Sequence, residues 1–241
     1  EKIPDYLCSS QSLSSYITSV NIPSSVTSIG NRAFCGCDKL VNAEMPDTVT
    51  SIGENVYSQS TKLKSIKLSS TLKTIGGGAF SGCTDLQKVV IPSTVTNLGS
   101  NAFNGCTSLT DAEFNYNTQK GYTLEIGGGA FYGCSALENV MLSENVSRIG
   151  SETFYGCGAL ETLILPESVT YLGSMMIRGT AVNSITIPKS VSDCGVNNSG
   201  SNYYLGPLAG ASYLTAVTIE DGMEKIPDYL CSSQSLSSYI T

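Results

Sequence analysis

The side chains of this 241-residue sequence that could do chemistry are its nine cysteines and twenty acidic residues, because the chain contains no histidine. The missing histidines remove the commonest general base, the commonest zinc ligand and every Ser-His or Cys-His nucleophile pair. Thiols could still form disulfides or bind a metal ion, and two carboxylates about 5 to 9 Å apart could hydrolyse a glycosidic bond. The positions of these residues decide among those chemistries.

Five of the nine cysteines occupy the same position of an internal repeat. Ser60 and Thr180 stand at that position in two other repeats, so it accepts small, weakly polar side chains. A buried thiol or hydroxyl there can bond to a backbone group of the turn, and we therefore expect a ladder of unpaired cysteines. The ladder consists of Cys37, Cys83, Cys106, Cys134 and Cys157.

Disulfides between neighbouring repeats and metal binding are the alternatives for these thiols. Cys35-Gly36-Cys37 resembles half of a metal knuckle, but no second pair and no histidine stands at ligand spacing. No metal or other cofactor is therefore expected. Cys8, Cys35 and Cys231 each follow the aromatic position of a repeat by one residue, where we expect them to face outward.

The charge balance excludes several partners. Thirteen basic residues against twenty acidic ones give a formal charge of −7, whereas binding to nucleic acids or to anionic membranes depends on clustered Lys and Arg. No stretch approaches the roughly 20 apolar residues that a membrane-spanning helix needs. We therefore expect neither nucleic-acid binding nor direct membrane insertion.

A repeat of 23 residues runs through most of the chain. Each copy contains a dipeptide of Ile or Leu followed by Gly, and an aromatic or aliphatic residue stands five positions after the first member. The Cys, Ser or Thr position follows, then a Leu and a segment of alternating apolar residues that often ends in Pro, as at 86–92. The first members of the dipeptides are Ile29, Ile52, Ile75, Leu98, Ile126, Ile149 and Leu172.

Elementary structural rules predict that this repeat forms a solenoid. The alternating residues of Leu-x-x-Val-x-Ile predict a short strand that Pro ends, and Val-x-x-Ile-Gly predicts a second extended edge. Ala-Phe-x-Gly-Cys is too short for a stable helix and predicts a helical or 3₁₀ turn. The triplets at 76–78 and 127–129 precede Ala-Phe, so we expect turns there rather than phosphate-binding loops. Since one unit cannot bury its apolar side, about ten units must stack into a single solenoid domain over residues 1–241.

The motif Leu-x-x-Val-x-Ile-Pro-x-x-Val-x-x-Ile-Gly-x-x-Ala-Phe-x-x-Cys resembles the repeat of the BspA-like (TpLRR-type) leucine-rich-repeat family of bacterial surface proteins, which also occurs in some parasitic protists. The resemblance covers nearly the whole chain. It implies an α/β horseshoe solenoid rich in β-structure, with a parallel sheet on the concave face and short strands and helical or 3₁₀ turns on the convex face. It also implies an extracellular or cell-surface location and adhesion to, or binding of, host or bacterial proteins.

By the same resemblance, the polar strand positions face outward on the concave side, and their charges are unevenly distributed. Basic residues come first, acidic residues follow, and a neutral surface of Ser, Thr and Asn comes last. Opposite charges on neighbouring strands could neutralise each other, as Lys88 with Asp111. Alternatively, they form a polarised recognition surface with apolar anchors. The candidate residues are Lys64, Lys67, Lys88, Asp111, Glu113, Glu138 and Glu161, with Val90, Met141 and Ile164 as anchors.

Two insertions interrupt the period and carry tyrosines. One lies between Phe114 and Ile126, and the other spans residues 196–206. Insertions in solenoids form loops along one edge that is often used for binding, although drift without function explains them equally well. The candidate loop contacts are Tyr116, Tyr122, Tyr203 and Tyr204.

Residues 1–18 are identical to residues 224–241. A larger tandem array, an engineered cap and a chain designed to continue end to end all explain this duplication. The array is the preferred explanation, and it predicts end-to-end continuation with further repeats.

Three functions stay open from the sequence. A non-enzymatic module that binds a protein ligand is preferred, and a structural spacer within a longer surface protein is the first alternative. A carboxylate-dependent glycoside hydrolase is disfavoured, because a shallow solenoid surface does not shield a pair of carboxylates.

Overall fold

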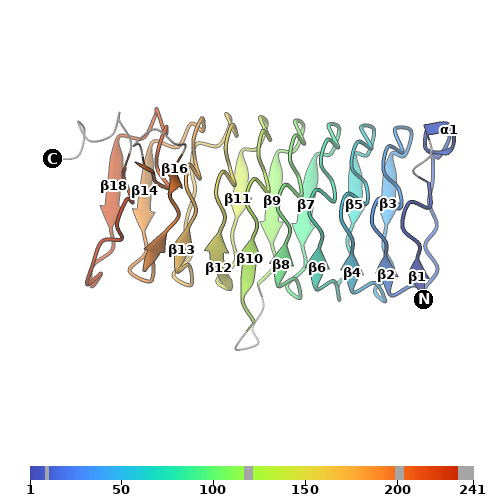
Figure 1. Ribbon diagram of the computed structural model, residues 1–241, viewed down its shortest axis with the longest axis horizontal. Helices are drawn as coiled ribbons and strands as arrows, with labels where there is room; N and C mark the ends of the chain where they lie inside the picture. The colour runs from blue at the N-terminus through green and yellow to red at the C-terminus, as the bar shows by residue number, and fades with distance from the viewer. Residues whose placement is uncertain (9–10, 117–121, 199–203, 233–241) are drawn as a thin grey trace.

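The computed structural model describes residues 1–8, 11–116, 122–198 and 204–232. The chain winds into about eight turns that lie side by side along the long axis of the molecule, from β1 at one end to β18 at the other (Figure 1). A regular turn contributes one strand to each of two parallel sheets. The leucine-rich-repeat solenoid predicted from the sequence is therefore confirmed.

One sheet, the short-strand sheet, is built from the Val-x-x-Ile-Gly part of the repeat. Its nine strands follow chain order and pair in parallel. From β2 to β13 the Ile or Leu of each strand is buried and the residue before it faces outward, as strand alternation requires, and Cys194 takes the buried position in β15. The strands are β1 (Lys2–Ile3), β2 (Ser28–Ile29), β4 (Ser51–Ile52), β6 (Thr74–Ile75), β8 (Asn97–Leu98), β10 (Leu124–Ile126), β12 (Val146–Ile149), β13 (Tyr171–Leu172) and β15 (Asp193–Cys194).

The other sheet, the long-strand sheet, is built from the Leu-x-x-Val-x-Ile segments and is the one predicted for the concave face. It consists of a five-stranded part and a separate two-stranded part, both parallel. The five strands are β3 (Asn42–Glu44), β5 (Ser65–Lys67), β7 (Lys88–Ile91), β9 (Asp111–Phe114) and β11 (Asn139–Met141), and the pair is β14 (Ser184–Ile187) with β18 (Ala216–Ile219). The second insertion adds a short antiparallel pair, β16 (Asn197–Asn198) with β17 (Tyr204–Leu205).

The aromatic residues of the repeat stack along the core. Neighbouring ring centroids lie 5.1 to 5.7 Å apart, and the rings are within 26° of parallel. This geometry is favourable for aromatic pairs, which add to the hydrophobic burial of each ring. The stacked residues are Phe34, Tyr57, Phe80, Phe103, Phe131 and Phe154, all of them buried.

The solenoid has fewer turns and less helix than the sequence predicted. About eight turns are present where ten were expected, and the nine strands of the short-strand sheet bound eight of them. Within the described residues the only helix is α1 (Gln11–Ser14), and none is long and apolar enough to cross a membrane. The turns of the repeat do not become helical because left-handed residues interrupt them, such as Gly78 (φ +62°) and Gly82 (φ +74°).

The outward orientation expected for Cys8 is wrong. Cys8 is buried and its amide donates to the Ala33 carbonyl, just as the Phe34 amide donates to Val56 one turn later. Cys8, rather than Leu7, therefore occupies the aromatic position, because it stands five residues after Ile3, just as Phe34 stands five residues after Ile29. Cys35 and Cys231 are half-buried.

Candidate binding face

Three rows of outward side chains cross the long-strand sheet, and we call this surface the long-strand face. Corresponding residues of neighbouring strands lie opposite each other, at the spacing of about 4.8 Å that parallel strands impose. From β5 to β14, the first row consists of Lys64, Gln87, Thr110, Glu138, Glu161 and Asn183. The second row consists of Ser65, Lys88, Asp111, Asn139, Thr162 and Ser184. The third row consists of Lys67, Val90, Glu113, Met141, Ile164 and Thr186.

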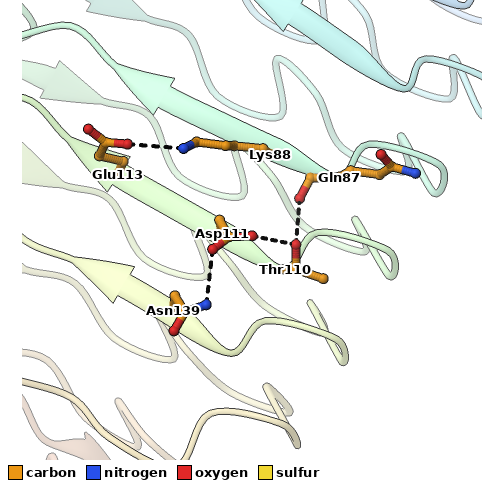
Figure 2. Close-up of polar contacts among 6 residues, drawn as sticks. All are labelled: Gln87, Lys88, Thr110, Asp111, Glu113 and Asn139. Carbon is orange, nitrogen blue, oxygen red and sulfur yellow. Dashed lines mark hydrogen bonds and ion pairs between the residues drawn. The ribbon is translucent and has the colours of Figure 1, made fainter.

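Two of the three candidate lysines are paired with carboxylates of neighbouring strands. Lys67 bonds to Glu44, and this hydrogen bond raises the pKa of the lysine. Lys88 Nζ lies 3.1 Å from Glu113 Oε2 (Figure 2). The long lysine side chain thus reaches the diagonal Glu113 and not the directly opposite Asp111, which corrects the expected pair. The first part of the basic surface is therefore largely neutralised.

Asp111 is held by uncharged neighbours (Figure 2). The Thr110 hydroxyl lies 2.6 Å from Asp111 Oδ2 and 3.1 Å from the Gln87 carbonyl oxygen, and Asn139 Nδ2 donates to Asp111 Oδ1 at 3.0 Å. The hydrogen bonds from Thr110 and Asn139, with the charge of Lys88 as a smaller contribution, lower the pKa of Asp111. This carboxylate is consequently already satisfied within the protein.

Exposed groups without such partners concentrate further along the face. Glu138, Glu161 and Glu167 form no ion pair or side-chain hydrogen bond within the part of the chain that the structure describes. Met141 and Ile164 are neighbours in the third row and are 66% and 81% exposed, whereas Val90 is half-buried. Lys64 is also exposed and unpaired, but it lies at the other end of the face.

The long-strand sheet is interrupted beside these groups, between β11 and β14. Residues 161–165 occupy the expected place, yet their backbone forms no hydrogen bond with any other described residue. The short-strand sheet continues through the same turns. The repeat is one residue shorter on the β14 side of this segment, because Thr180 precedes Val182 by two residues whereas Cys157 precedes Leu160 by three. On the β11 side the spacing from Val140 to Leu163 is the regular 23 residues, so the shortening does not explain the loss of pairing there.

A hollow of about 550 Å³ opens at this interruption. Its lining combines the buried apolar Leu163, Leu165 and Ile185 with hydroxyl groups and two carboxylates. Of the residues that line the hollow, the sequence singled out only Ile164 as a candidate, and it missed polar ones such as Glu167, Thr186, Thr218 and Glu220. The one signal near them in the sequence is the short Thr180–Val182 spacing, because a shorter repeat changes how two neighbouring turns align.

The repeated thiols form a ladder of hydrogen bonds between turns. Each donates to the carbonyl oxygen of the aromatic residue one turn earlier, at 3.1 to 3.2 Å for Cys83, Cys106, Cys134 and Cys157. Ser60 does the same at 3.1 Å. Cys37 is likewise buried, and burial raises the pKa of Cys37 and of Cys83 to about 12. Such thiols are poor nucleophiles and poor metal ligands, because both roles need the thiolate.

All nine cysteines are free, so no disulfide links neighbouring turns. The described ranges also contain no group of three side chains that could hold a metal ion. The thiol ladder is interrupted at Thr180, whose hydroxyl donates to Ile177 of its own turn at 2.8 Å. The interruption of the sheet and that of the ladder therefore coincide.

The two carboxylates at the hollow differ in their surroundings. Glu220 accepts the Lys189 amide at 2.8 Å and lies 3.7 Å from the Lys189 ammonium, whereas Glu167 is exposed. This arrangement does not provide the shielded pair that glycoside hydrolysis requires.

Of the candidate tyrosines, the structure describes Tyr116, Tyr122 and Tyr204. Tyr116 is exposed just after β9, while Tyr122 lies beside Thr96, Asn97 and Glu125 on the short-strand side. Tyr204 begins β17, and Tyr203 lies outside the described residues.

The repeat and the stacked fold agree with a comparison against known families. A family model described as BspA type leucine rich repeat region, in six copies, matches residues 1–123, 74–203 and 124–241, which together span the chain. The chain belongs to this family. No curated protein is significantly similar to this BspA-type chain.

Solved structures of leucine-rich repeat proteins resemble this BspA-type chain. One from Bacteroides ovatus ATCC 8483 is 28% identical with a TM-score of 0.54, over 84% of this chain and 66% of that one. Another, from Eubacterium ventriosum ATCC 27560, is 23% identical with a TM-score of 0.60, over 67% and 42%. The T. pallidum leucine rich repeat protein is 28% identical with a TM-score of 0.43, over 60% and 75%. The chain thus spans just under two thirds of the Bacteroides protein and less than half of the Eubacterium protein.

Proposed function

We propose that this BspA-type chain is a non-enzymatic module that binds a protein ligand through its long-strand face, on the surface of a bacterial cell or outside it. The observation that carries the proposal is the pairing of two highly exposed apolar side chains, Met141 and Ile164, beside the hollow at β14. Adjacent exposed apolar residues with a polar surround are typical of protein interaction sites.

The charges of the face support the same location. Lys67 and Lys88 are already paired with Glu44 and Glu113, so these groups offer little to a ligand. The exposed carboxylates around Met141 and Ile164 are unpaired among the described residues. Electrostatic complementarity with a partner would therefore act mainly on this part of the face.

Biolayer interferometry of the full chain against a panel of host matrix proteins and bacterial surface proteins tests the proposal. The informative variant is Met141→Lys combined with Ile164→Lys, and the control is Thr74→Lys, an exposed position on the short-strand sheet. We expect binding to at least one panel protein, weakened at least about tenfold by the double variant and unchanged by the control. A ligand whose binding depends on Thr74 but not on Met141 and Ile164 would contradict the proposal.

A structural spacer is the second candidate, and the regularity of the turns between Phe34 and Cys157 favours it. Those turns repeat the same stack and the same thiol ladder. A spacer predicts that no panel protein binds while the chain keeps a cooperative unfolding transition. The interferometry experiment therefore separates the two functions.

A further inference from the structure

We infer that the hollow between residues 161–167 and β14 is the specificity pocket of the long-strand face, and that it takes an aliphatic side chain from an extended, basic segment of a protein. The inference rests on the proposed function and narrows it to one place and one partner chemistry.

The apolar part of the argument comes from the interrupted sheet. Leu163, Leu165 and Ile185 are core residues that nevertheless line the hollow, because the break between residues 161–165 and β14 gives access to them. The neighbouring Ile164 is 81% exposed and forms a wall of the same hollow. A volume of about 550 Å³ lies within the usual range of ligand pockets and leaves ample room for one aliphatic side chain.

Backbone groups at the break favour an extended segment as the occupant. Within the described chain, the amides and carbonyls of residues 161–165 bond to no other residue, although they belong to a strand-like repeat segment. Main-chain groups of an incoming extended peptide can pair with such free groups, as in peptide recognition by strand addition. Side chains alternate along an extended peptide, so one of them can enter the hollow while its neighbours face the rim.

The charges around the hollow select a basic partner. Glu167 lines the hollow and Glu161 adjoins the lining residue Thr162, and neither has a cationic partner among the described residues. Lys189, which follows the lining residue Pro188, is engaged by Glu220. The chain as a whole carries a formal charge of −7. A segment with Lys or Arg beside its aliphatic residue therefore complements both the hollow and its rim.

Selection from a phage-displayed library of random dodecapeptides tests this assignment. The full chain is the target, and peptides are counter-selected on Ile164→Asp, a change at an exposed position that circular dichroism should show to leave the fold intact. Two variants then separate the contributions by fluorescence anisotropy. Glu161→Lys with Glu167→Lys tests the charge, and Glu54→Lys, on an exposed turn elsewhere, is the matched control.

We expect the peptides that prefer the wild-type chain to Ile164→Asp to combine a net positive charge with an aliphatic residue. Their affinity should fall at least about tenfold in Glu161→Lys with Glu167→Lys, at low salt, and stay unchanged in Glu54→Lys. Enrichment of acidic or neutral peptides, or no peptide that discriminates Ile164→Asp, overturns the inference. If peptides instead lose affinity on substitution of Lys64 or Val41, elsewhere on the face, the inference fails while the proposed function stands. If they lose it only in Thr74→Lys, both fail.

Discussion

The turns between Phe34 and Cys157 and the turns between Leu160 and Ile187 are built from the same repeat but end differently. In the first region the aromatic stack, the thiol ladder and the long-strand sheet all run from turn to turn. In the second, the stack stops at Phe154, the hydroxyl of Thr180 bonds within its own turn, and residues 161–165 leave the sheet. The short-strand sheet alone continues through both regions.

This contrast shows that a single interface between two turns of a solenoid can depart from the regular repeat. The stability of a solenoid is approximately the sum of contributions from the interfaces between neighbouring turns, so one interface can lose its strand pairing while the others keep theirs. Where the ladder is complete, charges such as Lys67 and Glu44 pair across strands. Where it is broken, Glu161 and Glu167 stay unpaired among the described residues and core side chains become accessible from the face.

The largest expected effect comes from breaking the regular region at its core. Phe103→Ala removes a fully buried ring between two stacked neighbours and should lower the free energy of unfolding by about 4 kcal/mol. Phe103→Leu, which keeps an apolar side chain as Ile177 does in a later turn, should cost less than half as much. Urea unfolding measures both, and equal costs would show that stacking and volume at this position do not matter.

Hydrogen exchange should separate the two regions directly. The amides of residues 163–165, which lack backbone partners in the described chain, should exchange about 100-fold faster than those of Ala112 and Glu113 in β9. At about 1.4 kcal/mol for each tenfold change, this equals about 2.8 kcal/mol of local stability. Residue-resolved NMR checks the ratio, with Leu172 of β13 as a protected control from the same turn. Equal exchange at residues 163–165 and in β9 would mean that the sheet is not broken.

A smaller effect concerns Tyr57, which is the one tyrosine in the buried aromatic stack from Phe34 to Phe154. Its Oη is the only buried side-chain polar atom without a partner in the described chain. Tyr57→Phe should therefore raise the free energy of unfolding by about 1 kcal/mol, because no buried hydroxyl is left unsatisfied. The reverse change in the next turn, Phe80→Tyr, should lower it by a similar amount. A loss of stability in Tyr57→Phe would indicate that the hydroxyl has a partner such as water.

The smallest effect is expected at the exposed ion pairs of the regular region. Lys67→Ala removes the partner of Glu44, but both side chains are largely in water, where such pairs contribute little. The thermal unfolding midpoint should stay within the experimental error of the wild type, as in Lys64→Ala, which removes an unpaired lysine. A clear drop for Lys67→Ala alone would assign the pair a structural role.

Much of the fold could be predicted because the repeat determines it locally. The burial of Cys83, Cys106 and the other repeated cysteines follows from their shared position with Ser60, and the two lines of strands follow from the apolar alternation. The partner of Lys88 could not be predicted, since it depends on side-chain reach across a strand register. The hollow was also missed, because residues 161–165 match the strand motif of the repeat, and their loss of pairing appears only when the turns are stacked.

The identical segments 1–8 and 224–231 show most directly what the sequence decides and what it leaves to the tertiary structure. By itself the sequence determined the repeat, the parallel solenoid and the apolar positions. The stacked structure decided which side of each turn is covered. Leu7 is 48% exposed but its counterpart Leu230 is 2% exposed, while the partly buried Ile3 corresponds to the exposed Ile226. The first copy packs against the turn that follows it and the second against the turn that precedes it. Burial belongs to the interface between turns, and a segment alone cannot encode which neighbour it meets.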